Sequence, residues 1–243
     1  MRISVCMATY NGEDFIEDQL YSILQQLDCD DEIIISDDGS SDKTLEIING
    51  IDDYRIKIYN HEKIQKIHKS AGHIYVSKNF EFALEKATGD IIFLSDQDDI
   101  WLDGRISRMK LELENHECVI CNFRLLGGDE DGKEYYLKNP ISKFTICNLI
   151  KMPFFGSAMA FKKNLLKLAL PFPDNLLLHD NWIGFLALKS SSVSYINEPL
   201  HFYRIHSSNT SNATRKSSNP FWYRILYRID FYYKLFMRLN KRK

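Results

Sequence analysis

No apolar run in the 243-residue sequence reaches the ~18 residues that a membrane-spanning helix needs. The first residues, MRISVCMATYNG, also lack the apolar core of a secretory signal peptide. We therefore expect a protein that is neither exported nor membrane-spanning. On that expectation the glycosylation sequons at Asn209 and Asn212 have no role.

Cysteine is scarce and odd in number, with five residues in the chain. Cys118 and Cys121 have the CxxC spacing of zinc sites, but no second pair follows them, so a zinc site is poorly supported. Several of the cysteines stand in apolar, strand-like runs. Reduced, buried thiols in a cytosolic protein are therefore expected.

The chain also lacks a large excess of charge of either sign, because its formal net charge is −2. The distribution is uneven, since residues 215–243 contain nine Lys or Arg and one Asp, which leaves the rest of the chain acidic. An acidic body can hold cations but is unsuited to nucleic acid, and a basic tail suits an anionic surface. We expect no nucleic-acid partner.

Short apolar runs alternate with helical patterns over residues 1–95. RISVCMA, EIIIS and DIIFLS predict strands that are buried on both faces, and YRIKIYN alternates like a further strand. Between them, FIEDQLYSILQQL, DKTLEIING and KNFEFALEKATG predict helices, the second capped by Ser40 or Ser41. Residues 60–76 are polar and predict a loop. The alternation predicts an α/β fold with a parallel, doubly wound sheet and helices on both faces.

Beyond residue 102 the pattern is mixed. CVICNFRLL, KEYYL, GSAMAFK and SVSYI predict short strands among helices over residues 103–200. Residues 207–219 are polar and lack large apolar side chains, so they form the best boundary in the chain.

Polar turns follow three of the predicted strands, namely TYNG, DDGSSD and DQDD. In an open parallel sheet all three lie at the carboxyl edge, where ligands bind. Ordinary turn and capping chemistry suffices for TYNG and stays an open alternative for DDGSSD. It fails for Asp96, Asp98 and Asp99, because three neighbouring carboxylates repel one another unless a cation lies between them. Mg²⁺ or Mn²⁺, held by carboxylates and completed by a substrate's phosphates, fits this requirement.

Taken in order, the motifs resemble one known family. TYNG, IISDDGSSD, FLSDQDDIW, GSAMAFK and HDNW together look like the family 2 glycosyltransferases, across residues 1–212. The spelling SDQDDIW, with YRIHSSNT further on, is similar to bacterial transferases that build O-antigen, capsule and other surface polysaccharides. The resemblance implies the GT-A fold with its Rossmann-like, mostly parallel sheet, inverting chemistry, a nucleotide-sugar donor and a divalent metal.

The resemblance also assigns residues to the donor. Thr9 matches a donor-contacting residue of the first turn, and Asp38, with Asp37 beside it, matches an acid that contacts the uracil or thymine base. Lys78 falls where the family often has a basic residue near the donor, and there it could offset diphosphate charge. A solvated position at a helix start is the alternative for Lys78.

Four residues are assigned to the metal and the diphosphate in the same way. Asp96 and Asp98 match the family's metal and ribose acids, with Asp98 as the preferred metal ligand. Arg204 and His206 lie in a segment that folds over the donor in related enzymes, where they could reach the diphosphate or the metal. Polar loop positions are the alternative for this pair.

Asp180, in LLLHDNWIGFLAL, matches the family's catalytic base, in a motif often spelled ED and here HD. Such a base takes the proton of the acceptor hydroxyl as that oxygen attacks the anomeric carbon. A helix N-cap is the alternative role for Asp180, and the charge state of His179 could tune its pKa. Phe154 and Phe155 could stack on sugar rings or pack in the core.

The last segment, PFWYRILYRIDFYYKLFMRLNKRK, predicts a helix that begins near Pro220. Its apolar face consists of Trp222, Ile225, Leu226, Ile229, Tyr233 and Phe236. Its basic face consists of Arg224, Arg228, Lys234, Arg238 and Lys241. We expect this helix to lie on an anionic membrane surface, to which its basic residues are attracted, and packing on the domain or on a second copy is the alternative.

Together these features predict an inverting, metal-dependent hexosyltransferase of surface-polysaccharide synthesis. It would move a hexose from UDP-glucose or UDP-galactose to an undecaprenyl-diphosphate-linked saccharide at the cytoplasmic face of the membrane, forming a β linkage, with dTDP-rhamnose as the rival donor. The expected parts are a GT-A domain over residues 1–212, with a nucleotide-binding half at 1–100 and an acceptor half at 101–212, and a membrane-associating helix within residues 213–243.

Two rival classes fit the sequence less well. A sugar nucleotidyltransferase should have a Gly-rich, basic first turn to hold a triphosphate, and TYNG lacks one. A non-catalytic saccharide-binding scaffold would predict broken acidic motifs, whereas Asp38, Asp96, Asp98 and Asp180 are all present. No motif encodes the sugar, the linkage position or the oligomeric state.

Overall fold

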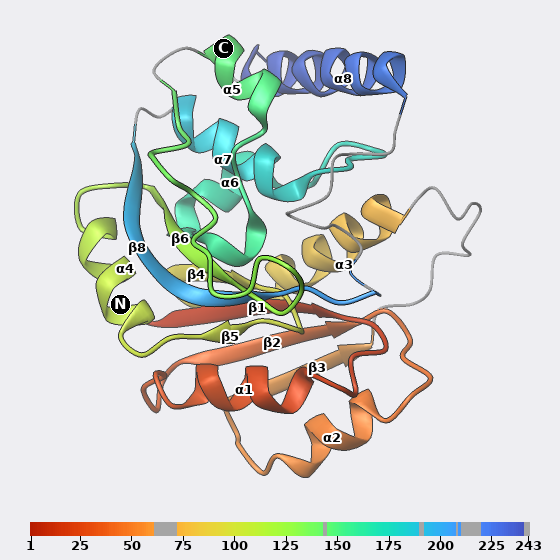
Figure 1. Ribbon diagram of the computed structural model, residues 1–243, viewed down its shortest axis with the longest axis vertical. Helices are drawn as coiled ribbons and strands as arrows, with labels where there is room; N and C mark the ends of the chain where they lie inside the picture. Colours follow the sequence, from red (N-terminus) through yellow and green to blue (C-terminus); the bar gives the residue numbers. More distant parts are fainter. Residues whose placement is uncertain (61–71, 143–144, 190–191, 208, 210–219, 241–243) are drawn as a thin grey trace.

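A mixed sheet of eight strands runs through the part of the chain that the computed structural model describes, residues 1–60, 72–142, 145–189, 192–207, 209 and 220–240 (Figure 1). The first half contains β1 (Ile3–Thr9), α1 (Ile16–Leu24), β2 (Glu32–Asp37), α2 (Thr44–Gly50), β3 (Ile56–Asn60), α3 (Gly72–Lys86) and β4 (Ile91–Ser95). The second half contains β5 (Ile100–Trp101), α4 (Arg105–Leu113), β6 (Cys118–Leu126), α5 (Thr145–Lys151), η2 (Gly156–Ala158), β7 (Met159–Lys162), η3 (Lys163–Leu165), α6 (Leu166–Ala169), α7 (His179–Lys189), β8 (Val193–Arg204) and α8 (Phe221–Asn240).

The strand order is β3-β2-β1-β4-β7-β6-β8-β5. The four strands of the first half are parallel, as the strand and helix alternation predicted. Strand β7 pairs antiparallel with both β4 and β6, and β8 returns to pair parallel with β6 and antiparallel with the short β5. The predicted α/β fold with a Rossmann-like first half is therefore confirmed, and the second half makes the sheet mixed.

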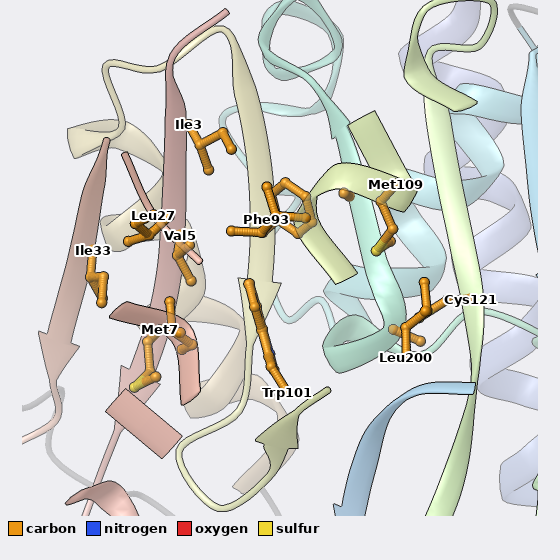
Figure 2. Packing of buried hydrophobic residues seen from close by; sticks show 14 of the residues in the cluster. Ile3, Val5, Met7, Leu27, Ile33, Phe93, Trp101, Met109, Cys121 and Leu200 are labelled. Atoms are coloured by element: carbon orange, nitrogen blue, oxygen red, sulfur yellow. The ribbon is translucent and has the colours of Figure 1, made fainter. Parts of the chain in front are cut away.

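Alternate side chains of the central strands point into two apolar layers. Val5, Ile33 and Phe93 belong to the layer covered by α1, α2 and α4, part of which Figure 2 shows. Their neighbours in sequence, such as Cys6 and Ile34, belong to the layer covered by α3, α6 and α7. Because both faces of these strands are buried, their sequences are continuous apolar runs rather than alternating ones.

Three local predictions were wrong. Helix α3 begins at Gly72, so residues 72–76 are helical rather than loop, while residues 61–71 lie outside the described part of the chain. Neither Ser40 nor Ser41 caps α2, because the Asp42 carboxylate accepts the Thr44 amide hydrogen bond there. The segment KEYYL forms no strand and contributes one isolated bridge, between Arg124 and Glu134.

Cys118 and Cys121 illustrate why CxxC spacing on a strand does not make a metal site. Cys118 lies in the layer under α7, whereas Cys121 lies in the layer under α4. The two thiols therefore point to opposite faces of β6. The described residues contain no disulfide, and Cys29 is exposed rather than buried.

Helix α8 lies outermost, beyond α7 (Figure 1), and its basic side packs on the domain. Phe231 and Leu235, on the basic side of the helix, are buried against the domain, where the Phe231 ring meets Trp182 and Phe185. The Arg228 guanidinium donates to the carbonyl oxygens of Leu149 and Ile150, and Arg238 donates to the carbonyl oxygens at the end of α6, from Leu168 to Leu170.

The predicted apolar face of α8 is directed outward. Its exposed large side chains are Trp222, Leu226, Ile229, Tyr233 and Phe236. The basic face thus holds the helix on the domain, and Lys241 lies outside the described residues. Among the helices of the described part, none is long and apolar enough to cross a membrane.

Candidate active site

The acidic turn after β4 is held in place by two glutamines. The buried Gln19 of α1 donates from Nε2 to Ser95 Oγ at 2.7 Å and to the Asp96 carbonyl oxygen at 3.1 Å. Gln97 accepts from the Tyr10 amide at 2.9 Å and donates to the Tyr10 carbonyl oxygen at 3.1 Å. A Cβ atom on Gly12 would lie 2.6 Å from the Gln97 side chain, so glycine permits this close approach.

Asp98 meets the end of β8 and the residues that follow it, where Arg204 and His206 lie. The His206 Nε2 atom lies 2.7 Å from Asp98 Oδ2, and the Asn209 amide nitrogen lies 3.2 Å from the same oxygen. The Arg204 guanidinium donates through Nε to the Asp98 carbonyl oxygen at 2.9 Å. Both His206 and Arg204 also contact Phe15, with the Phe15 ring centroid 4.5 Å from that of His206.

Asp96 lies between the acidic turn that contains Asp98 and the start of α7, where Asp180 lies. Its carboxyl is partly buried, and its pKa is raised to about 7, first by the loss of water and then by the negative charges of Asp98 and Asp180. Asp96 is therefore close enough to both residues to sense their charges. Folding has gathered these three acids from the end of β4 and the start of α7.

Asp180 lies in the first turn of α7. Burial raises the pKa of its carboxyl to about 6, although hydrogen bonds from Asn181 and from the backbone amide of Gly156 oppose that shift. Asp180 Oδ1 accepts from the Asn181 backbone amide at 2.7 Å and from its side chain at 3.1 Å. A carboxyl with a raised pKa, close to Asp96, is suited to accept a proton near neutral pH.

The neighbouring His179 is neutral, because burial, with a smaller contribution from the charge of His73, lowers its pKa to about 3. Its ring stacks on Phe80 with centroids 4.3 Å apart. The alternative in which a charged His179 tunes Asp180 therefore does not apply. Phe154 is 1% exposed and packs in the core, whereas Phe155 is only partly buried.

The first two turns are tied to each other at the same edge of the sheet. Thr9 Oγ1 donates to Asp37 Oδ1 at 3.0 Å, and both oxygens of Asp37 accept hydrogen bonds from Ser40. Asp37 is thus largely occupied by the turn itself. Asp38, next in the chain, is mostly buried, and its backbone amide bonds to the Thr9 carbonyl oxygen at 2.9 Å.

Lys78 lies in the middle of α3 rather than at a helix start. Its ammonium group forms an ion pair with Glu81 at 2.8 Å on the same helix. Asn79, beside it, is the residue that reaches the first turn, where its side chain donates to the Thr9 carbonyl oxygen at 3.3 Å.

Sequence reasoning missed several residues that shape the site, namely Gln19, Gln97, Phe15 and Asn209. Gln19 is a polar residue at a buried position of an amphipathic helix, and that mismatch was a usable signal. Asn209 was noted only as a glycosylation sequon. Its contact with Asp98 depends on the return of β8 to the acidic turn, which no local pattern encodes.

The donor set fits a hard divalent cation. The described residues contain no group of three or more His, Cys, Asp or Glu side chains that could hold a metal by themselves. Asp98 and His206 are in contact, however, and Asp96 lies close to Asp98. Mg²⁺ and Mn²⁺ often take only one or two carboxylates from the protein, while substrate phosphates and water complete the shell.

A Rossmann-like sheet with an acidic turn at its carboxyl edge and a second carboxyl across from it defines the class of GT-A glycosyltransferases. The sequence pattern of glycosyl transferase family 2 matches residues 4–171. The chain belongs to this family and is a glycosyltransferase. The nucleotidyltransferase and scaffold alternatives are thereby set aside.

Two relatives show the range of the similarity. The dTDP-rhamnosyl transferase RfbG of Shigella flexneri is 30% identical over 220 residues, covering 85% of this chain and 74% of its own. The UDP-Glc:alpha-D-GlcNAc-diphosphoundecaprenol beta-1,3-glucosyltransferase WfgD of Escherichia coli is 26% identical over 226 residues, covering 90% of this chain and 83% of its own.

Two solved structures share the fold. S. aureus TarS 1–349 in complex with UDP-GlcNAc matches with a TM-score of 0.71 and 18% identity, over 95% of this chain and 66% of TarS. The mannosyltransferase PcManGT of Pyrobaculum calidifontis, in complex with GDP-Man and Mn²⁺, matches with a TM-score of 0.59 and 20% identity, over 85% of this chain and 57% of its own. This chain therefore spans less than two thirds of the length of either structure.

Proposed function

We propose that this glycosyltransferase is inverting and metal-dependent, and that it transfers a hexose from a UDP-sugar to a polyprenyl-diphosphate-linked saccharide, forming a β linkage. The observation that carries the proposal is the gathering of Asp98, Asp96 and Asp180 from two distant segments at one edge of the sheet. In this arrangement Asp96 and Asp98 would bind the metal that neutralises the departing diphosphate, and Asp180 would accept the proton of the entering hydroxyl.

The donor occupies the edge formed by the ends of β1, β2 and β4. Thr9 and Asp38, with Asp37 fixing the turn, contact the nucleoside, and Asp96 accepts hydrogen bonds from the ribose or sugar hydroxyls. Arg204 pairs with the diphosphate, because its guanidinium is already directed at the acidic turn. Lys78 is the weakest member of this set, since its charge is engaged by Glu81.

Asp98 would hold the metal, with Asp96 and His206 beside it. When bound, Mn²⁺ or Mg²⁺ neutralises charge that develops on the leaving diphosphate. Asp180 accepts the proton of the acceptor hydroxyl while that oxygen bonds to the anomeric carbon and the nucleoside diphosphate departs from the opposite face. Attack from the opposite face inverts the configuration of that carbon.

The pathway and location complete the proposal. One relative's name specifies a diphosphoundecaprenol-linked acceptor, which supports a role in O-antigen or other surface-polysaccharide synthesis at the cytoplasmic face of the membrane. The protein is proposed to be peripheral there, with the outward apolar face of α8 as its contact.

The test is transfer and binding with a panel of donors. UDP-glucose, UDP-galactose, UDP-N-acetylglucosamine and dTDP-rhamnose are each titrated with Mn²⁺, with Mg²⁺ and with a chelator, for the wild type and for Asp98→Ala. Metal-dependent binding of one donor, lost in Asp98→Ala, is expected. Equal binding with the chelator would contradict the metal role.

A dTDP-rhamnosyltransferase is the second candidate, because the relative at 30% identity is named for that donor. The same titration separates the two candidates, since only one nucleotide should bind tightly. Preference for dTDP-rhamnose would replace the UDP-sugar proposal and leave the roles of Asp98 and Asp180 unchanged.

A further inference from the structure

Beneath the acidic turn lies a cluster of buried polar side chains that the proposed mechanism does not use. It consists of Asp99, Arg105, Ser157 and His201, which come from four different segments of the chain and are each 2% exposed or less. Burying polar and charged groups is costly unless they are held by partners. Such a cluster directly under a reaction site therefore calls for a reason.

Asp99 joins the acidic turn to the end of β8. Its Oδ1 accepts from the Arg204 backbone amide at 3.2 Å, so it fixes the residue whose side chain returns to Asp98. Its Oδ2 lies 3.8 Å from Nε2 of His201, which precedes Arg204 by three positions on the same strand. The β5 and β8 pairing, in which Trp101 lies opposite His201, sets this register.

Arg105 joins the same cluster to the turn beside Asp180. Its guanidinium stacks on the Trp101 ring with 4.3 Å between the guanidinium carbon and the centroid, and it donates to the Ser157 carbonyl oxygen. The Ser157 hydroxyl lies 3.4 Å from His201 Nε2. The preceding residue, Gly156, packs against the first turn of α7, where a Cβ atom added to it would lie 3.7 Å from Asp180 Cβ.

These contacts therefore form a continuous chain between two groups of residues that the proposed reaction needs at a fixed distance from each other. At one end are Asp98 and Arg204, on the diphosphate side, and at the other end is Asp180. We propose that Asp99 and Arg105 are positioning residues that hold the acidic turn, the end of β8 and the Gly156–Asp180 contact in one fixed arrangement. The inference rests on the proposed function for its consequence in catalysis, but the positioning itself is a property of the protein alone.

The consequence for the reaction follows from geometry. A misplacement of reacting groups by ~1 Å can cost about 100-fold in rate. Loss of Arg105 frees the 156–158 turn, which shifts Asp180 while Asp98 and Arg204 keep their own contacts. Arg105→Met, which can still pack on Trp101, should therefore lower kcat by about 10- to 100-fold and leave the binding of UDP-glucose with Mn²⁺ within about threefold.

Two further readouts separate positioning from simple loss of stability. Arg105→Lys keeps a donor for the Ser157 carbonyl oxygen and should recover part of the lost kcat. In Arg105→Met the acid limb of the pH profile should move to higher pH, because the Gly156 backbone then lies farther from the Asp180 carboxyl and lowers its pKa less. A role in stability alone would produce neither effect.

The role of Asp99 can be tested by amide hydrogen exchange, which needs no measurement of enzyme activity. Asp99→Ala should make the Arg204 amide hydrogen exchange about tenfold faster in the donor-free protein, because its acceptor is gone. Asp99→Asn keeps an oxygen acceptor and should retain most of the protection. If the Arg204 amide hydrogen exchanges at the wild-type rate in Asp99→Ala, Asp99 does not position Arg204.

Glu32→Gln is the matched control. Glu32 is also a buried, hydrogen-bonded carboxylate, but it lies at the start of β2, whereas the candidate site lies at the end of that strand. This variant should lower the unfolding temperature and change neither kcat nor Arg204 exchange. If Arg105→Met and Asp99→Ala behave like Glu32→Gln, the positioning proposal is wrong. If the wild type transfers no sugar from any donor, the proposed function is wrong, while amide exchange still decides the positioning.

Discussion

At Asp180, burial directly affects the proposed function, because it changes the pKa of the carboxyl group that would act as the base. Its pKa is raised from the ordinary 3.8 to about 6 by burial, against opposing hydrogen bonds. A general base acts only as the carboxylate, so kcat/KM should fall as the pH drops through about 6 rather than through about 4. A pH profile of transfer between pH 4.5 and 8 measures this limb.

Substitution gives a second test of the same residue. Asp180→Asn keeps the shape but cannot accept the proton, and should lower kcat by about 100-fold or more. Asp174→Asn is the matched control, because Asp174 is an exposed carboxylate shortly before the same helix. Transfer by Asp180→Asn at the wild-type rate would remove Asp180 from the mechanism.

Glu32 shows a carboxylate that is shifted in the other direction. Burial would raise its pKa, but hydrogen bonds and the Lys57 ion pair outweigh burial and lower it from 4.5 to about 2. The ionised form therefore stabilises the fold at pH values above 4.5, and this stabilisation is lost as the pH falls toward 2. Glu32→Gln should lower the free energy of unfolding by about 2–3 kcal/mol at pH 7.

Denaturant unfolding of Glu32→Gln and the wild type at pH 7 and near pH 3 measures this difference, which should shrink at the lower pH. The exposed Glu46→Gln is the control and should change the free energy of unfolding by less than about 0.5 kcal/mol. A difference that does not depend on pH would mean that packing, rather than charge, accounts for the effect of Glu32→Gln.

Individual residues were predictable to the extent that their role is local. Asp98 could be proposed because it lies in an acidic turn that follows a buried strand, whereas Asp180 was proposed because its motif resembles that of a family. The capping of α2 was predicted at the wrong residue, because Ser40 bonds to Asp37 and leaves Asp42 to accept from Thr44. Several hydroxyl and carboxyl groups compete within such a turn, and their choice depends on the neighbouring turn.

Among the elements, α8 has the least usual arrangement. Its arginines donate to backbone carbonyl oxygens of the domain, so the basic side is the docking side. Trp222 is 72% exposed and Leu226 is 64% exposed on the opposite side, and Ile150 of the neighbouring α5 is 63% exposed. An outward face of this kind, rich in Trp, Tyr and aliphatic residues, suits the interfacial region of a bilayer.

We predict that apolar burial, more than charge, holds the protein on vesicles. Leu226→Gln and Ile229→Gln should each weaken binding to vesicles of phosphatidylglycerol and phosphatidylcholine by about tenfold, without changing the unfolding temperature. Binding should persist at high salt, because apolar burial is not screened. Co-flotation with vesicles measures both effects.

The control is Leu111→Gln on α4, since Leu111 is 58% exposed but α4 covers the other face of the sheet. It should leave flotation unchanged. If the same α8 substitutions instead abolish self-association in the absence of lipid, then a second copy of the chain, and not the membrane, covers this face.

Elements were predictable where the hydrophobic pattern is continuous and local. The strands β1, β2 and β4 matched apolar runs because both of their faces are buried. Strand β8 extends to Arg204, well past the predicted SVSYI, because its second half obtains partners from β5 and β6 that lie far away in sequence. Its extension is what delivers Arg204 and His206 to Asp98.

At the scale of the whole molecule, the site is a product of the sheet order. The parallel first half supplies Thr9, Asp38 and Asp98 from the ends of adjacent strands, an arrangement that the alternation of strands and helices implies. The second half supplies Asp180 and His206, and only the antiparallel return of β7 and the parallel return of β8 bring them to that edge. Motif resemblance could identify these residues, but their contacts required the long-range pairing.

In the proposed function, residues from both halves contact the donor, so donor binding should stabilise the whole fold. A ligand at 100 times its Kd adds about 2.7 kcal/mol to the free energy of unfolding. For a chain of this size that corresponds to a rise of about 5–10 °C in unfolding temperature. We predict this rise with the preferred nucleotide-sugar and Mn²⁺ together, and a much smaller rise with either one alone.

Asp98→Ala should abolish the part of the rise that needs Mn²⁺, because the diphosphate and the protein then lose their common cation. Glu32→Gln should unfold at a lower temperature yet show the same rise as the wild type, since Glu32 lies away from the donor edge. Thermal unfolding with and without a chelator measures each difference. An equal rise in wild type and Asp98→Ala would show that the acidic turn binds the donor without a metal.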